Sequence, residues 1–308
     1  MPHDSPQALF DANAALVAAV NASSIEAMDM ALAQGADARA VGGTQKLTAL
    51  DIASSRGFLE AVVRLIPLSD TERRDPDGGL RPLMRAAFNG SALCVAALLP
   101  HCDPNAQDDS GFTALMWATQ SRRLSAAKIL KPRTDLSLTN HRGQTALMIA
   151  AAAGDIGHLS LLLLGSDARF ANEAGETALM NAAIQGHVDC VFALLPFLRA
   201  EDIRAKNASG ASAFAEAVGE DQWACVDILS EFATESELES AFFLIDAAGA
   251  ENFPRWSARI EANALREEVK IGERLGVATE ARGSAEITDF DVSGGVSEKT
   301  KTARRRAL

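Results

Sequence analysis

A short pattern that returns at a nearly fixed interval constrains the fold of this chain more than any other feature. Thr-Ala-Leu occurs at Thr48, Thr113, Thr145 and Thr177, and two related copies are Arg81-Pro82-Leu83 and Ser212-Ala213-Phe214. The successive spacings are 33, 32, 32, 32 and 35 residues. A period near 33 residues predicts small helical units that stack on one another and share a continuous core.

Each unit contains two helical segments. In the copy that begins at Thr145, the threonine can cap a short helix, and Gly154 can end it because glycine tolerates positive φ. A second, leucine-rich segment follows over residues 159–163, and a polar turn over 172–175 leads into the next copy. Only 5% of the residues are aromatic, so the core is predicted to be aliphatic, which suits closely packed helices.

These units resemble the ankyrin repeat family, whose G-x-T-P-L-H-x-A-A-x-x-G-H segment leads into an x-x-V-x-x-L-L helix. The resemblance covers roughly residues 8–240 and implies an all-α ankyrin-repeat solenoid of stacked helix-turn-helix units, with a C-terminal helix and a disordered tail. Where the family has histidine, this chain has Met84, Met116, Met148 and Met180. Methionine can only pack, so we expect turns held more by packing and less by polar contacts.

The pattern weakens toward both ends of the chain. Thr234-Glu235-Ser236-Glu237 has the form of a capping box, which predicts the start of a terminal helix. We expect a capping unit (1–42), about five repeats (43–232), a capping helix (233–250), an accessory amphipathic helix (251–276) and a disordered, basic-ended tail (277–308). The accessory helix is open to two interpretations, packing on the stack or docking on a partner.

The net charge of −12 argues against nucleic-acid binding by the acidic body of the chain. Residues 299–306 contain five basic side chains. We interpret this segment as a solvated tail; the alternatives are an import signal, a phosphosite region or an anionic docking patch. Four cysteines do not suggest a disulfide scaffold, and no signal peptide or membrane-spanning run is recognised. We expect a cytoplasmic protein without membrane insertion, or a nuclear one if Arg304–Arg306 acts as a signal.

The cysteines follow the repeat. Cys94, Cys190 and Cys225 each lie 13 residues after the start of their copy, and His158 takes the same place in another copy. We interpret this row as buried packing rather than a metal or redox site. Asp108-Asp109-Ser110-Gly111 lacks the spacing of a calcium loop, and no catalytic or phosphate-binding motif occurs. No cofactor, metal or catalytic residue is therefore predicted.

The family resemblance places binding on a concave side built from the turns and the first helix of each unit. The candidate partner-binding residues are Arg85, Phe88, Asn89, Phe112, Trp117, Gln120, Gln144, Glu176, Asn181 and Gln185. Exposed Trp, Phe and Arg are favoured at interfaces, although Phe88 and Trp117 can instead fill gaps between units. The leading hypothesis is a non-enzymatic scaffold or adaptor that binds a protein and no small-molecule substrate. The alternative is a substrate-receptor or inhibitory subunit that docks through residues 234–275.

Overall fold

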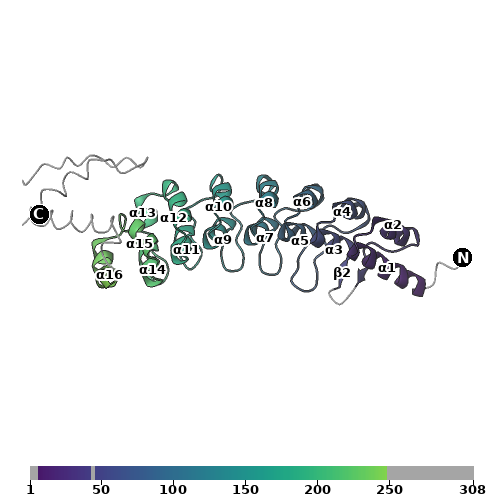
Figure 1. The fold of residues 1–308 in the computed structure, drawn as a ribbon, viewed down its shortest axis with the longest axis horizontal. Coiled ribbons are helices and arrows are strands. Elements are labelled where there is room, and N and C mark those ends of the chain that lie inside the picture. The colour runs from purple at the N-terminus through teal and green to yellow at the C-terminus, as the bar shows by residue number, and fades with distance from the viewer. Residues whose placement is uncertain (1–5, 43–45, 248–308) are drawn as a thin grey trace, which may run out of the picture. The chain divides into compact units, whose positions relative to one another are not determined.

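The computed structural model describes residues 6–42 and 46–247, and helices make up most of this part of the chain (Figure 1). The first helices of the successive units are α1 (Pro6–Asn21), α3 (Ala49–Arg56), α5 (Pro82–Asn89), α7 (Ala114–Gln120), α9 (Ala146–Ala152), α11 (Ala178–Ile184) and α14 (Ala213–Gly219). The second helices are α2 (Ile25–Ala33), α4 (Leu59–Leu65), α6 (Ala92–Leu98), α8 (Leu124–Leu130), α10 (Ile156–Leu163), α12 (Val188–Leu194) and α15 (Trp223–Leu229). This arrangement confirms the all-α repeat solenoid.

Shorter elements complete the units. The single-turn helices η1 (Ile66–Leu68), η2 (Leu99–His101), η3 (Lys131–Arg133) and η4 (Leu195–Phe197) extend four second helices, and α13 (Ala200–Ile203) and α16 (Glu235–Ala247) lie toward the C-terminal side. Two short antiparallel strands, β1 (Val41–Gly42) and β2 (Leu47–Thr48), pair Val41 with Thr48. Six helix pairs lie between Ala49 and Leu229 in the described chain, one more than the five repeats expected.

The recurring hydroxyl residue starts the first helix of most units. The side-chain oxygen of Thr145, for example, accepts a hydrogen bond from the backbone N–H of Met148 at 3.3 Å. The same cap occurs at Thr48, Thr113, Thr177 and Ser212. In the copy that starts at Arg81 no such cap is made, and Pro82 occupies the first turn, where a missing N–H costs nothing.

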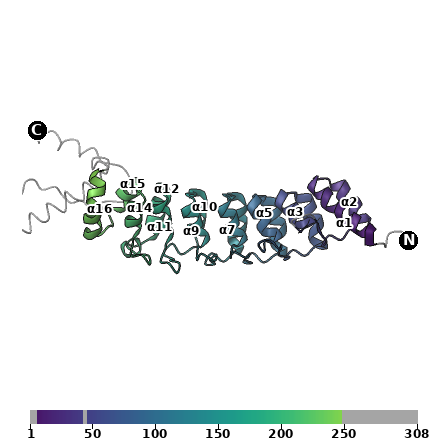
Figure 2. The same ribbon diagram turned by 90° about the horizontal axis from the view of Figure 1, so that it is seen from below.

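The first helices form one row and the second helices form another, and each unit packs on the next (Figures 1 and 2). Met84, Met116, Met148 and Met180 lie between successive first helices and are each about 1% exposed. The small side chains of Ala150 and Ala182 are fully buried, so neighbouring helices can approach closely. The methionine row is therefore part of the core.

Polar contacts between neighbouring loops accompany the packing of the methionine row. Backbone hydrogen bonds join the N–H of Asp109 to Gly78 O at 2.9 Å and the N–H of His141 to Ser110 O at 3.0 Å. Gln107 also donates its side-chain amide to Thr139 O at 2.8 Å. Backbone groups and amide side chains together form these ties, and the methionines that replace the family histidine take no part in them.

The C-terminal end of the stack has the predicted capping box. The Thr234 backbone N–H donates to Glu237 at 2.8 Å, and the Glu237 N–H donates to the Thr234 hydroxyl at 3.3 Å. Leu238 and Ala241 of α16 are each 2% exposed, and α16 packs against α14. The predicted accessory helix (251–276) and disordered tail (277–308) lie outside the described residues. Within the described chain, none of the helices is both long enough and apolar enough to cross a membrane.

Candidate partner-binding face

The loops before the first helices, together with the exposed sides of those helices, form what we call the inner face. Of the ten predicted residues, Phe88, Gln120 and Gln185 are exposed, and the half-buried ones are Arg85, Asn89, Phe112, Trp117, Gln144 and Glu176. Asn181 is only 9% exposed. Its placement among the surface residues is therefore wrong, because it faces the body of the stack at a position that is more open in the units of Arg85 and Trp117.

Three of the predicted residues form an aromatic cluster, which we define as Phe88, Phe112 and Trp117. The Phe88 and Trp117 ring centroids lie 5.6 Å apart in an edge-on arrangement, and those of Phe112 and Trp117 lie 4.9 Å apart. Phe88 comes from α5, Trp117 from α7 and Phe112 from the loop before α7. The rings thus pack between two units, as the packing interpretation predicts, and Phe88 remains 51% exposed, which leaves it accessible to a partner.

The loop before α7 fixes the orientation of the aromatic cluster. Asp108 is 6% exposed, and its carboxylate accepts the backbone N–H groups of Ser110 at 2.9 Å and Phe112 at 2.8 Å. Its other oxygen accepts the Trp117 indole N–H at 2.8 Å. A carboxylate that orders its own loop and holds the indole leaves the tryptophan with little freedom before any partner arrives. The sequence Asp108–Gly111 therefore serves as a turn.

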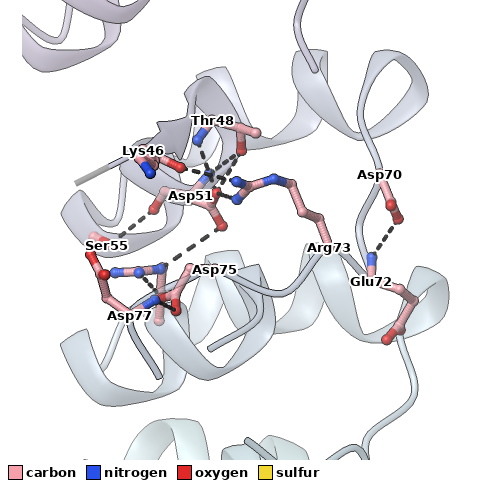
Figure 3. A network of polar contacts seen from close by, with 10 residues as sticks. Lys46, Thr48, Asp51, Ser55, Asp70, Glu72, Arg73, Asp75 and Asp77 are labelled. Atoms are coloured by element: carbon pink, nitrogen blue, oxygen red, sulfur yellow. Dashed lines mark hydrogen bonds and ion pairs between the residues drawn. The ribbon is translucent and has the colours of Figure 1, made fainter. Parts of the chain in front are cut away.

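A buried network of charges lies at the interface between α3 and α5 (Figure 3). Asp51 of α3 is fully buried and stands where the later units have methionine. Its carboxylate accepts hydrogen bonds from the Thr48 backbone N–H at 2.9 Å and from Arg73 at 3.0 Å. Arg73 also donates to the Lys46 carbonyl oxygen at 3.0 Å, which ties the long loop after η1 back to the start of α3.

Arg85, predicted as a contact residue, belongs to this network. Its guanidinium is bonded to the carboxylate of Asp75, and its Nε lies 3.9 Å from the second oxygen of Asp51. The Arg85 side chain is 18% exposed and Asp75 is 5% exposed. Most of the charge of Arg85 is therefore neutralised within the chain, which makes it a positioning residue for the first repeats more than a free contact.

The network escaped the sequence analysis, although the repeat alignment contained its signal. Asp51 occupies the methionine position, and Arg73 lies 25 residues after Thr48, where the later units have Ala106, Leu138 and Phe170. An acidic residue at an otherwise apolar position requires a buried cation nearby. The copy that starts at Thr48 has both the aspartate, Asp51, and the arginine, Arg73. Their joint occurrence in one copy could have predicted the ion pair.

The cysteine row is buried, as predicted. Cys94, Cys190 and Cys225 are each at most 1% exposed, and burial raises the pKa of all three thiols, that of Cys225 to about 11. Burial also raises the pKa of Cys102 to about 12. Such thiols carry almost no thiolate at neutral pH, and thiolate is the reactive form.

The two interior histidines make local contacts. Nδ1 of the buried His158 lies 2.8 Å from the Asp155 carboxylate at the start of α10, and Nε2 of His187 lies 3.1 Å from Ala152 O of the preceding unit. Throughout residues 6–42 and 46–247, no group of three histidine, cysteine or acidic side chains is arranged to hold a metal ion.

Comparison with known families gives one match. A family model described as ankyrin repeats (3 copies) matches residues 53–140, 83–168, 125–207 and 147–240. The four segments overlap and together cover residues 53–240, from within α3 to within α16. No curated protein matches the chain.

Proposed function

Because the chain belongs to the ankyrin repeat family, whose members are generally protein–protein interaction modules, we propose that it is a non-enzymatic scaffold or adaptor. Its partner protein binds on the inner face. The observation that carries this proposal is the aromatic cluster, in which Phe88 is half exposed next to a tryptophan that the Asp108 carboxylate already holds in place. Preorganised aromatic side chains contribute most of the binding energy at many interfaces.

The inner face is a better candidate than the segment 234–275, through which an enzyme-associated subunit would dock. Leu238 and Ala241 of that segment are already buried against the stack. The first part of the segment therefore serves as a cap, and the aromatic cluster offers the more suitable contact surface.

Affinity capture with a matched pair of variants tests the proposal. Phe88→Ala removes an exposed ring from the inner face, whereas Phe192→Ala removes a ring of similar exposure (51% and 45%) from the second helix α12. Proteins retained by the wild type are expected to be lost with Phe88→Ala and kept with Phe192→Ala. Circular dichroism should show the same helical content in all three proteins.

Two results would count against the proposal. One is retention of the same proteins by Phe88→Ala and the wild type, which would remove the inner face as the binding surface. The other is turnover of a substrate by the purified chain, which would make it an enzyme.

A further inference from the structure

We infer that the inner face selects an extended partner segment whose charge changes sign along its length: an acidic part with a large apolar side chain lies over α3, α5 and α7, and a basic part lies over α11 and α14. The inference rests on the proposed function and specifies the chemistry of the partner. It arises from charges that change from positive to negative along the stack at equivalent repeat positions.

One repeat position shows this change directly. At the end of each first helix, eight residues after its start position, the successive units have Arg56, Asn89, Ser121, Ala153, Gln185 and Glu220. Arg56 and Glu220 are both exposed. Four positions earlier in the same helices, Arg85 of α5, which is paired with Asp75, corresponds to Glu216 of α14. The row after the turn glycine has Leu80, Phe112, Gln144, Glu176 and Ala211, so its charged member lies toward the C-terminal side of the stack. The first row therefore places exposed charges of opposite sign, Arg56 and Glu220, toward the two ends of the stack.

The positive part of the face surrounds the aromatic cluster. Arg123 donates from Nε to the Phe88 carbonyl oxygen at 3.3 Å, so its charge stands beside the half-exposed Phe88 ring. Arg122 donates to Ala153 O of the next unit at 2.5 Å. Both side chains are exposed, and neither forms an ion pair with any residue that the structure describes.

Carbonyl oxygens orient both guanidinium groups, and Arg122 also interacts electrostatically with Asp155, whose pKa it helps to lower. The exposed Asp109 on a nearby loop is already paired with Arg74. Asp77 is an exposed carboxylate at another loop tip. A carboxylate on a partner would therefore find oriented and exposed cations beside an apolar contact, and such pairs guide the register of a complex.

The negative part covers the last two repeats. Residues 170–247 contain 14 acidic and three basic residues, whereas residues 46–169 contain 12 acidic and 14 basic residues. On the inner face of this part, Glu173 and Glu220 are exposed, and Glu176 and Glu216 are half buried. Lys206 is the exposed cation nearest to them along the loop before α14. Uniform sign over two neighbouring repeats attracts a basic segment and repels an acidic one.

The fourth repeat separates the two parts. Its first helix α9 has no charged side chain: Ile149 is 4% exposed, and Ala152 and the following Ala153 are half buried. Successive units stack about 10 Å apart, so the aromatic cluster and α14 are separated by roughly 30 Å. An extended chain rises about 3.3 Å per residue, and the acidic and basic parts of the partner are therefore roughly nine residues apart.

The test uses the full chain and three fluorescein-labelled synthetic peptides of equal length. The first joins Asp-Glu-Leu-Phe-Asp-Glu through a Gly-Ser linker of eight residues to Lys-Arg-Lys-Arg. The second and third carry the same apolar residues with only acidic or only basic charges. Fluorescence anisotropy should show that the first peptide binds at least tenfold more tightly than either of the others, and that its affinity falls with added salt.

Charge reversals with matched controls locate the contacts. Arg122→Glu, directly after α7, and Glu220→Lys, directly after α14, should each weaken binding of the first peptide at least fivefold. Lys128→Glu on α8 and Asp189→Lys on α12 make the same charge changes at exposed residues of the second helices and should change the affinity less than twofold. Equal effects of the inner and outer reversals would overturn the inference, since overall charge alone would then explain binding.

Two further outcomes separate this inference from the proposed function. If none of the peptides binds, while Phe88→Ala still abolishes capture of cellular proteins, the proposed function stands and the partner chemistry inferred here is wrong. If the first peptide binds only after residues 298–308 are removed, the inference is also overturned, because the basic segment of the chain itself would be the occupant.

Discussion

The interface between α3 and α5 and the interface between α9 and α11 each join the first helices of neighbouring units, but their chemistry differs. Asp51 fills the central position of the first interface and Met148 that of the second, and both side chains are at most 1% exposed. Asp51 is surrounded by Arg73 and Arg85, whereas the positions equivalent to these arginines next to Met148 are Phe170 and Asn181. A charged carboxylate in one repeat and a thioether in another thus occupy the same repeat position.

The difference teaches that the repeat tolerates a buried charge only together with its partners. Removing an ionised carboxylate from water costs several kcal/mol, and nearby cations with good hydrogen bonds must offset this cost. Asp51 has two hydrogen bonds from Thr48 and one from Arg73. Such a network need not exceed an apolar core in stability, but each of its members depends strongly on the others.

The largest change in the free energy of unfolding is expected when an aspartate is placed in a repeat that lacks the two arginines. Met148→Asp introduces a buried carboxylate beside Phe170 and Asn181, where no arginine occupies the equivalent positions, and should lower the free energy of unfolding by at least about 4 kcal/mol. Urea unfolding followed by circular dichroism measures it. Met148→Leu is the control and should cost less than about 1.5 kcal/mol. A mild effect of Met148→Asp would mean that the two interfaces are equivalent.

A smaller effect is expected from the reverse exchange. Asp51→Met leaves Arg73 without its carboxylate and removes the acceptor for the Thr48 N–H, which should cost about 3 kcal/mol in the same unfolding measurement. Arg73 and Arg85 are each about a fifth exposed and can turn partly toward water, which limits the loss. Unchanged or greater stability of Asp51→Met would contradict the view that the network holds the first interface.

The smallest effect concerns a polar contact in the fourth repeat itself. Burial acts to raise the pKa of Asp155, but hydrogen bonds from the His158 backbone and ring outweigh it and place the pKa below 3.8. A carboxyl with a lowered folded-state pKa stabilises the fold fully above its unfolded value, and this stabilisation disappears as the pH falls through the folded value.

Asp155→Ala should therefore lower the free energy of unfolding by about 1 kcal/mol at pH 7, and this difference should shrink toward zero as the pH falls below 3.8. Urea titrations of both proteins between pH 2.5 and 7, taken as a set of about six conditions, measure it. A difference that stays constant over this range would mean that Asp155 acts through packing rather than through its charge.

Much of the fold followed from the repeat period. The position of Thr145 predicted its helix cap, Gly154 has the left-handed φ of 66° expected of a glycine that follows a helix, and the burial of Cys190 followed from its repeat position. These features are local or recur in every unit, so one sequence contains several independent copies of the signal.

The candidate site was less accessible to sequence analysis. The position that is half exposed at Trp117 is buried at Asn181, because exposure at one repeat position depends on the neighbouring loop as well as on the helix. Arg85 was read as a contact residue because its partners, Asp75 in the loop and Asp51 in the preceding unit, lie 10 and 34 residues away. Pairing over such separations follows from three-dimensional packing and is not contained in the motif.

The backbone hydrogen bonds between adjacent loop tips have an evolutionary consequence. Main-chain hydrogen bonds run from the N–H of Asp109 to Gly78 O, from that of His141 to Ser110 O and from that of Ala208 to Ala174 O. Every amino acid except proline has the N–H group that these bonds require. Apart from Gly78, whose φ of 147° favours glycine, side chains at these tips can therefore be exchanged without breaking the ties that hold the loops together. The chain can acquire a new binding specificity by mutation at its tips while its folding stability is kept, and the same positions are the ones to randomise in a library selected for new ligands.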